Sequence, residues 1–219
     1  MHDHDHGRVR RQTARITERS VLTLHLVRHG ETAAAAEGYY AGDIDPPLIA
    51  AGIEQAHRLA AAVAGMDLTA LYVSPKLRAR MTMAAIERAT GMSAKVETGL
   101  KEIGYGRWDG MREEEVRRTD AQLHAAWSAD PAMVSPPGGE TAFDILGRAM
   151  PVILRIHAEH PDGRVLVVSH KATIRVLTCA LLEIYAGRFR DRIACPTASI
   201  TTFELGPRGA LLVRHGQTF

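Results

Sequence analysis

The sequence predicts an α/β fold, a three-layer α/β/α sandwich around a mostly parallel sheet. Strand-like and helix-like segments alternate after residue 20, and such alternation is typical of a parallel sheet covered by helices on both faces. Two segments, 22–29 and 164–170, are apolar runs that each end in a histidine. Runs rich in Val and Leu are expected for strands buried on both faces. Both histidines should therefore lie at one edge of the sheet, where α/β proteins bind ligands.

The first strand is followed by clear turn and helix signals. An Ala-rich stretch, 32–37, comes directly after it, and the loop 42–47 is rich in Gly, Asp and Pro. Apolar residues then recur at helical spacing over 49–63. This spacing predicts an amphipathic helix.

A second strand is expected over 70–73, where an apolar run is followed by Ser74 and Pro75. Ser is a favoured N-cap residue, and Pro is favoured at the first helical position. We therefore predict a helix that is capped by Ser74 and runs to about Ala89. The loop 99–110 then interrupts the alternation.

The second half of the chain completes the pattern. The expected elements are two helices within 112–127, a long helix over 141–160 after the loop 135–140, a helix from the end of the strand 164–170 through Leu182, and closing strands over 199–205 and 210–214. A Gly-Pro-Arg-Gly turn separates the two closing strands.

Length and composition fit one domain preceded by a short tail. The chain has 219 residues, of which 46% are hydrophobic, enough to bury a full core. Residues 1–20 hold five Arg against three acidic residues, so they account for the net charge of +2 and leave a neutral body. We predict that residues 1–20 are disordered and assign no role to their alternating His and Asp. A neutral body with 5% aromatic residues does not favour nucleic-acid binding.

Membrane and export signals are not visible in the sequence. The N-terminus lacks the apolar stretch of a signal peptide, and no run approaches the roughly 20 apolar residues of a membrane span. Cys179 and Cys195 lie far apart, without a metal-binding spacing. They indicate a reduced setting, so we expect a cytoplasmic protein without a membrane partner.

Histidines and arginines gather at the predicted edge of the sheet. His29 and His170 end two strands, and Arg28 directly precedes His29. Arg78 lies in the first turn of the helix that follows a third strand. Helix N-termini attract anions, and the planar fork of arginine matches phosphate oxygens. The sequence therefore predicts a phosphoryl-binding site.

An ordered set of short motifs spans nearly the whole chain after residue 20. The segments are 26–32 (Leu-Val-Arg-His-Gly-Glu-Thr), Pro47-Leu48 with Gly52 and Gln55-Ala56, 74–79 (Ser-Pro-Lys-Leu-Arg-Ala), 100–103 (Leu-Lys-Glu-Ile), 106–110 (Gly-Arg-Trp-Asp-Gly), 138–141 (Gly-Gly-Glu-Thr) and 167–170 (Val-Val-Ser-His). Together they resemble branch 1 of the histidine phosphatase superfamily, which includes the cofactor-dependent phosphoglycerate mutases. The resemblance implies a phosphoglycerate mutase-like fold, with a histidine phosphatase domain over residues 21–219.

The same resemblance implies a role for each residue around the phosphoryl group. His29 would be the nucleophile, because a neutral imidazole can attack phosphorus and form a phosphohistidine. Arg28, Arg78 and His170 would hold the phosphoryl oxygens and stabilise the charge that develops on them. The hydroxyl of Thr32 would complete this cradle. The arginines would take the place of a metal ion, so neither a metal nor a cofactor is expected.

The proton donor implied by the resemblance is Glu102. It would protonate the leaving alkoxide and then activate the water that attacks the phosphohistidine. Glu31 and Glu140 are alternative carboxylates, although Glu102 stands at the family's position before the Gly-x-Trp-x-Gly stretch. In that stretch Asp109 replaces the usual Glu and keeps the charge.

Two positions depart from the family pattern. Ala35 stands where an Asn is common, so one polar phosphate contact is missing. Lys171 replaces the Gly that commonly follows the second histidine. Lys171 could bind a second anionic group of the substrate or could point to solvent, and both interpretations stay open. Arg175, one turn further on, could simply anchor the helix.

A second copy of the histidine signature lies at the C-terminus, where Leu-Leu-Val-Arg-His-Gly-Gln-Thr includes His215. No helix follows it to supply backbone N–H groups, and no second set of partners exists for it. We interpret this copy as coincidence.

The resemblance favours a metal-independent hydrolase of the histidine acid phosphatase type, acting on a small phosphorylated metabolite. A cofactor-dependent phosphoglycerate mutase is the alternative, but the segment 103–110 lacks the Arg-Tyr-Gly signature of those mutases. A non-catalytic phospholigand-binding module and a metal-dependent hydrolase are further alternatives. The natural substrate is not readable from the chain, and a homodimer through a sheet edge or through the helix 141–160 is compatible with it.

Overall fold

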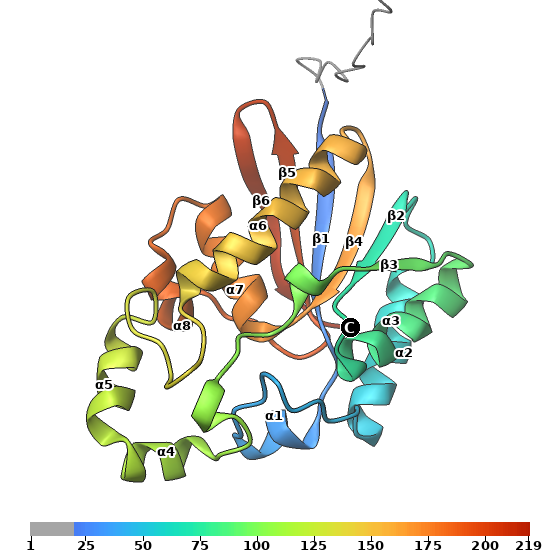
Figure 1. The fold of residues 1–219 in the computed structure, drawn as a ribbon. Coiled ribbons are helices and arrows are strands. Elements are labelled where there is room, and N and C mark those ends of the chain that lie inside the picture. Colours follow the sequence, from blue (N-terminus) through green and yellow to red (C-terminus); the bar gives the residue numbers. More distant parts are fainter. Residues whose placement is uncertain (1–19) are drawn as a thin grey trace, which may run out of the picture.

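One central sheet organises the molecule. The computed structural model describes residues 20–219, and within them six strands pair in the order β3-β2-β4-β1-β5-β6 (Figure 1). The strands are β1 (Leu22–Arg28), β2 (Ala70–Val73), β3 (Ala94–Val96), β4 (Arg164–Ser169), β5 (Ile200–Gly206) and β6 (Gly209–Gln217). Strands β1 to β4 pair in parallel, whereas β5 is antiparallel to both β1 and β6. The sheet is therefore mostly parallel, as predicted.

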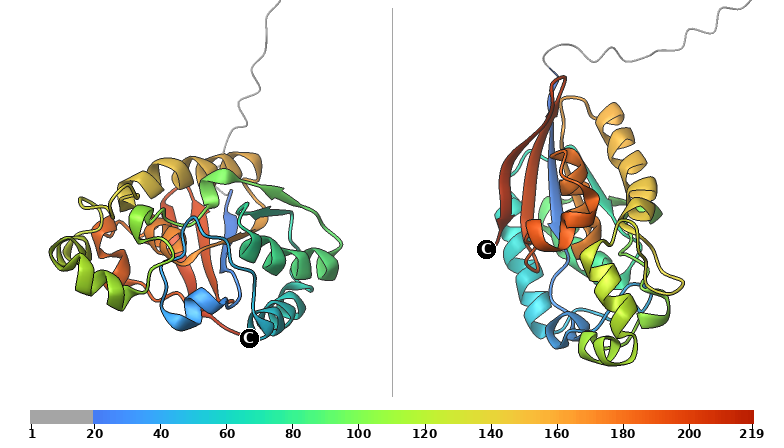
Figure 2. Two further views of the ribbon diagram at one scale, coloured as in Figure 1. Left: turned by 60° about the horizontal axis from the view of Figure 1, so that its bottom comes forward. Right: turned by 90° about the vertical axis from the view of Figure 1, so that its left-hand side faces the viewer.

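Helices cover both faces of this sheet. They are α1 (Ala33–Glu37), α2 (Ala50–Val63), α3 (Leu77–Thr90), α4 (Glu113–Thr119), α5 (Ala121–Ala129), α6 (Ala142–Glu159), α7 (Lys171–Leu181) and α8 (Phe189–Arg192). Figure 2 shows α2 and α3 on one side and α6 and α7 on the other. In β4, Val165 and Val167 join the core under α6 and α7, whereas Leu166 and Val168 join the core under α2 and α3. This alternation of buried side chains confirms the predicted three-layer sandwich.

The start of α3 differs from the prediction. The helix begins at Leu77 with Lys76 as its N-cap residue, and the carboxylate of Asp45, not the Ser74 hydroxyl, accepts the Leu77 backbone N–H at 2.9 Å. The Ser74 hydroxyl instead accepts a hydrogen bond from the Lys76 backbone N–H at 3.3 Å and lies 2.7 Å from Nε2 of His170. Ser74 therefore serves the site rather than the helix, and Pro75 belongs to the connecting turn. The short elements β3 and α8 were not predicted, because three or four residues carry too little periodicity.

A smaller core lies outside the sandwich, next to α4 and α5. It consists of the buried side chains Tyr40, Trp108, Val116 and Trp127. In Figure 1 this region lies beyond the carboxyl ends of the strands, at the same end of the molecule as α1. The two helices between 112 and 127 were predicted, but their separate aromatic core was not.

The predicted disorder of residues 1–20 lies almost entirely outside the described residues. Among the helices of residues 20–219, none combines the length and the apolar character needed to cross a membrane.

Candidate active site

Neighbouring parallel strands bring the two predicted histidines together. β1 and β4 pair in a register that sets Arg28 opposite Ser169, so His29 and His170 emerge side by side. Their ring centroids are 5.1 Å apart. Both side chains are buried, with 4% and 0% exposure. The sheet edge that the sequence predicted therefore holds the histidine pair.

His29 is held in the form that a nucleophile requires. Its Nδ1 lies 2.7 Å from the carbonyl oxygen of Gly30. Because a carbonyl oxygen only accepts, Nδ1 carries the proton and Nε2 keeps its lone pair. Burial, together with the nearby Arg28 and Arg78, holds the pKa of His29 well below its ordinary value of 6.5. The imidazole is thus neutral at neutral pH, and it lines a pocket together with Arg28, Arg78 and Glu102.

His170 lies behind His29 rather than on the pocket wall. Its Nε2 is 2.7 Å from the Ser74 hydroxyl, and within residues 20–219 its Nδ1 has no hydrogen-bond partner. Burial and the neighbouring His29 and Arg78 keep the pKa of His170 well below 6.5. Among the predicted site residues, His170 is the one that does not line the pocket.

Arg28 and Arg78 reach the pocket from different elements, as predicted. Arg78 in α3 is 1% exposed, and it donates hydrogen bonds to the carbonyls of Ala41 at 2.9 Å and Ile44 at 3.2 Å. It also forms an ion pair with Asp45 at 3.3 Å. These contacts hold the guanidinium in one orientation.

The loop that orients Arg78 is itself held by Asp109. The two carboxylate oxygens of Asp109 accept backbone N–H bonds from Gly42 at 2.6 Å and Ile44 at 2.5 Å. From the sequence, Asp109 was expected only to be a conservative replacement of Glu. Its role in fixing the loop 41–45 depends on contacts between distant segments, which no local pattern reveals.

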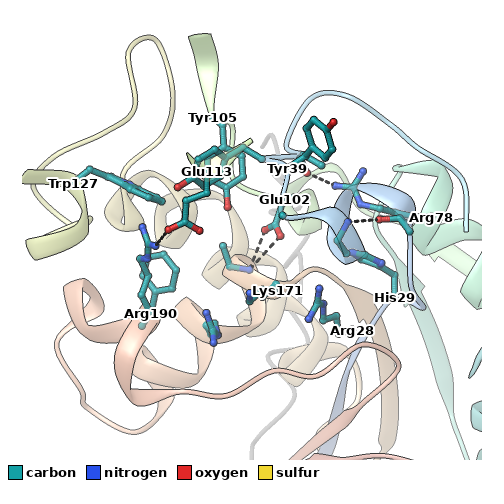
Figure 3. A pocket seen from close by; sticks show the side chains of 18 residues that line it. Arg28, His29, Tyr39, Arg78, Glu102, Tyr105, Glu113, Trp127, Lys171 and Arg190 are labelled. Carbon is teal, nitrogen blue, oxygen red and sulfur yellow. Dashed lines mark hydrogen bonds and ion pairs between the residues drawn. The ribbon is translucent and has the colours of Figure 1, made fainter. Parts of the chain in front are cut away.

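Glu102 is the carboxylate that enters the pocket among the three candidates. It is 7% exposed and accepts backbone N–H bonds from Ile103 at 3.0 Å and from Ala172 at 3.1 Å, the latter in the first turn of α7. In Figure 3 the Glu102 carboxylate faces the cavity, with Lys171 and Arg78 on different sides of it. Glu140 pairs with Arg148 at 2.8 Å, and neither Glu140 nor Glu31 lines the pocket.

Arg148 of α6 supports the segment that carries Glu102. Its guanidinium donates to the carbonyl oxygens of Gly99 and Lys101, both at 2.8 Å, and of Glu102 at 3.1 Å. Glu140 neutralises the same guanidinium. Arg148 was not predicted from the sequence, because a helical Arg carries no signal of contacts with a loop far away in the chain.

Thr32 lines the pocket and also caps a helix. Its hydroxyl accepts the backbone N–H of Ala35 at 3.2 Å, as the N-cap of α1. The hydroxyl hydrogen stays available to a phosphoryl oxygen. Ala35, where the family pattern has Asn, lines the pocket with a methyl group.

Lys171, whose orientation the sequence left open, lines the pocket, and most of the remaining wall comes from residues that were not predicted to belong to the site. Lys171 and Arg175 of α7 line it, together with Tyr39, Tyr40, Tyr105, Glu113, Trp127, Phe189 and Arg190. The Arg190 guanidinium stacks on the Trp127 ring at 3.9 Å. His215 lies on the exposed edge strand β6, with Nδ1 3.4 Å from the Thr201 hydroxyl, and is not among the lining residues.

Comparisons with known proteins define the family. The chain matches the model of the histidine phosphatase superfamily (branch 1) over residues 24–218, so it belongs to this superfamily. It is 30% identical over 194 residues to phosphoserine phosphatase 1 of Hydrogenobacter thermophilus, covering 89% of this chain and 92% of that protein. It is 29% identical to the adenosylcobalamin/alpha-ribazole phosphatase of Escherichia coli, covering 75% of this chain and 81% of the relative.

Solved structures agree with this assignment. Bacillus stearothermophilus YhfR superposes with a TM-score of 0.85 and 26% identity, covering 90% of this chain and 98% of that one. A mycobacterial glucosyl-3-phosphoglycerate phosphatase gives a TM-score of 0.82 and 25% identity, with 90% and 99% coverage. The predicted family and the phosphoglycerate mutase-like fold are confirmed, and the chain stands among the phosphatases of this family.

Proposed function

We propose that this protein is a phosphomonoesterase that hydrolyses a small phosphorylated metabolite through a phosphohistidine on His29, with Glu102 as the proton donor. The observation that carries the proposal is the 2.7 Å contact between His29 Nδ1 and the Gly30 carbonyl oxygen, which places the proton on Nδ1 and leaves Nε2 free to attack. Arg28, Arg78 and Glu102 line the same pocket as this imidazole.

The proposed reaction has two displacements at phosphorus. In the first, the Nε2 lone pair of His29 forms a bond to phosphorus, the bond to the ester oxygen breaks, and Glu102 gives its proton to that oxygen. In the second, the Glu102 carboxylate takes a proton from water, the water oxygen attacks phosphorus, and the N–P bond breaks. Inorganic phosphate and neutral His29 result. Arg28 and Arg78 stabilise the charge on the phosphoryl oxygens in both steps.

A labelling experiment tests the nucleophile. Protein mixed with a 32P-phosphomonoester and quenched should carry acid-labile phosphate, and His29→Ala should abolish the label and lower kcat at least about a thousandfold. His215→Ala is the matched control, because His215 stands in the repeated signature but outside the pocket. Unchanged turnover by a folded His29→Ala variant would show that another group is the nucleophile. A wild-type protein that shows neither label nor turnover would favour a non-catalytic phospholigand-binding module.

We also propose that the catalytic activity does not require a metal ion. Two arginines already face the pocket, and residues 20–219 contain no group of three or more His, Cys, Asp or Glu side chains placed to hold a metal ion. Activity should therefore persist in EDTA. A loss of activity that added Mg²⁺ or Zn²⁺ restores would contradict this part of the proposal.

Similarity to phosphatases favours hydrolysis over the mutase reaction, because the similar proteins include phosphoserine, alpha-ribazole and glucosyl-3-phosphoglycerate phosphatases. With 3-phosphoglycerate and catalytic bisphosphoglycerate, we expect release of inorganic phosphate. Rapid formation of 2-phosphoglycerate would instead identify a mutase. A panel of phosphomonoesters that includes phosphoserine would then rank substrates by kcat/KM.

A further inference from the structure

The pocket carries positive charge beyond the residues that the proposed reaction uses. Lys171 and Arg175 line it, and both lie on α7, four residues apart. Residues at this spacing lie on the same face of a helix. The face of α7 that meets the pocket therefore presents two cations beside Arg28.

The guanidinium of Arg175 lacks a hydrogen-bond acceptor within the described residues. Its Nε is fully buried and has no partner in residues 20–219, and the same holds for Nε of Arg28. A buried N–H group without an acceptor is costly, so such groups usually face an oxygen. Both side chains line the pocket, and the acceptor that fits them is an anionic oxygen of a ligand.

Within the described residues, no carboxylate forms an ion pair with Lys171 or Arg175, although the Glu102 carboxylate attracts the Lys171 amine and partly offsets its charge. Glu113 instead pairs with Arg117 at 2.8 Å and lies 3.9 Å from Arg190. Glu102 also faces the pocket, but its oxygens accept backbone N–H bonds from α7. Lys171 keeps an exposed surface, yet crowding by the pocket wall, together with Arg175 and Arg28, lowers the pKa of its amine. These cations therefore repel one another until an anion binds between them.

We infer that Lys171 and Arg175 form a subsite for a second anionic group, so that the preferred substrates are phosphomonoesters that also carry a carboxylate or a second phosphate. This inference rests on the proposed phosphatase function, and it names the substrate class of that same site. Arg190 also lines the pocket and has a buried Nη1 without a partner in residues 20–219, but we leave it out of the subsite, because its guanidinium stacks on Trp127 and lies 3.9 Å from the Glu113 carboxylate.

Matched substrate pairs test the subsite. 3-Phosphoglycerate differs from glycerol 3-phosphate by a carboxylate, and fructose 1,6-bisphosphate differs from fructose 6-phosphate by a second phosphate. In at least one pair, the wild-type kcat/KM should favour the member with the extra anion by about tenfold or more. The pair that responds tells a carboxylate from a phosphate ligand.

Variants connect this preference to the two residues. Lys171→Met and Arg175→Met should each lower the preference ratio several-fold, whereas the matched control Lys95→Met, on the exposed strand β3, should leave it unchanged. Equal kcat/KM within both wild-type pairs, or an unchanged ratio in both α7 variants, would overturn the subsite and leave the phosphatase proposal standing. If no compound is hydrolysed, the proposed function fails instead. Calorimetric binding of the same four compounds to the same proteins then decides the subsite by the same ratios.

Discussion

Glu102 acquires its position from neighbours that are remote in the sequence. The first turn of α7 supplies backbone N–H donors to its carboxylate, and Arg148 fixes the backbone on either side of it. The side chain is thereby held at the pocket while one edge stays accessible. This arrangement suits a group that gives up a proton and takes one back at the same place.

Glu102→Gln tests that role through its dependence on the leaving group. Glutamine keeps an oxygen for the α7 N–H groups but cannot donate or accept the catalytic proton. For alkyl phosphates kcat should fall about 10²–10⁴-fold, whereas p-nitrophenyl phosphate should lose much less, because p-nitrophenolate leaves without a proton. Glu54→Gln, on the exposed face of α2, is the matched control. Equal losses on both kinds of substrate would show that Glu102 is not the proton donor.

Residue roles could be predicted where they depend on short segments. Arg28 and His29 follow a recognisable strand, and Arg78 lies in the first turn of a helix, so their meeting follows from the rules of parallel sheets. Glu102 lies in an irregular segment, and only the family resemblance pointed to it. Whether Lys171 faced the pocket stayed open, because a residue at a helix start can face either way until the neighbouring segments are placed.

At the scale of elements, the first turn after β1 depends on the close approach of α2. A Cβ on Gly52 would collide with the Glu31 carbonyl oxygen, and a Cβ on Gly30 would collide with the Gly52 carbonyl oxygen. The backbones of the histidine motif and of α2 therefore touch directly, which explains why Gly52 belongs to the motif set. The predicted amphipathic helix over 49–63 indicated α2, but periodicity could not show this contact.

Gly52→Ala should therefore destabilise the protein by about 2 kcal/mol or more, because backbone on both sides must shift to admit the methyl group. The control is Gly65→Ala just after α2, where an added Cβ meets nothing within 4 Å. That substitution should be neutral or stabilise by up to about 1 kcal/mol. Urea denaturation measures both changes, and similar stability of the two variants would contradict the packing argument.

Helix α6 likewise positions the segment that carries Glu102, through Arg148. Arg148 is largely buried and holds three carbonyl oxygens of the 99–102 segment, so Arg148→Met should lower the free energy of unfolding by about 2–4 kcal/mol. The folded fraction of Arg148→Met should also lose more activity on alkyl phosphates than on p-nitrophenyl phosphate, which is the pattern expected for Glu102→Gln. Arg155→Met, in the exposed part of α6, should cost less than about 1 kcal/mol. Equal activity losses on both substrates would limit Arg148 to a purely structural role.

At the scale of the whole molecule, His29 and His170 are buried at the sheet edge, where the cores on the two faces of the sheet both reach the site. Val27 and Val168, next to the two site segments, belong to the core under α2 and α3, while Leu26 and Val167 belong to the core under α6 and α7. The sandwich predicted from alternation follows from these two cores. The third core around Trp108 and Trp127 was not predictable, because its aromatic residues come from separate loops and short helices. Because His29 and His170 are buried, the stability of the fold should also depend on pH.

The pH dependence of stability follows from the lowered pKa values of His29 and His170. Above about pH 6.5 both histidines are neutral in the folded and unfolded chains, so the pH does not change stability through them. Below pH 6.5 the unfolded chain binds protons that the folded protein excludes. The free energy of unfolding should therefore fall by up to about 1.4 kcal/mol per pH unit for each histidine, until the lowered folded pKa is reached. The buried His25 and His124 act in the same direction.

Urea denaturation at pH 7.5, 6.5 and 5.5 measures this loss. The carboxylates with lowered pKa values, such as Glu140, affect stability mainly below about pH 4.5, outside this window. His170→Gln removes one excluded proton, so its loss between pH 6.5 and 5.5 should be smaller than that of the wild type by about 1 kcal/mol. His57→Gln, on the exposed face of α2, should follow the wild type. Identical slopes for His170→Gln and the wild type would mean that His170 takes up its proton equally well in the folded protein, and the lowered pKa of His170 would then be wrong.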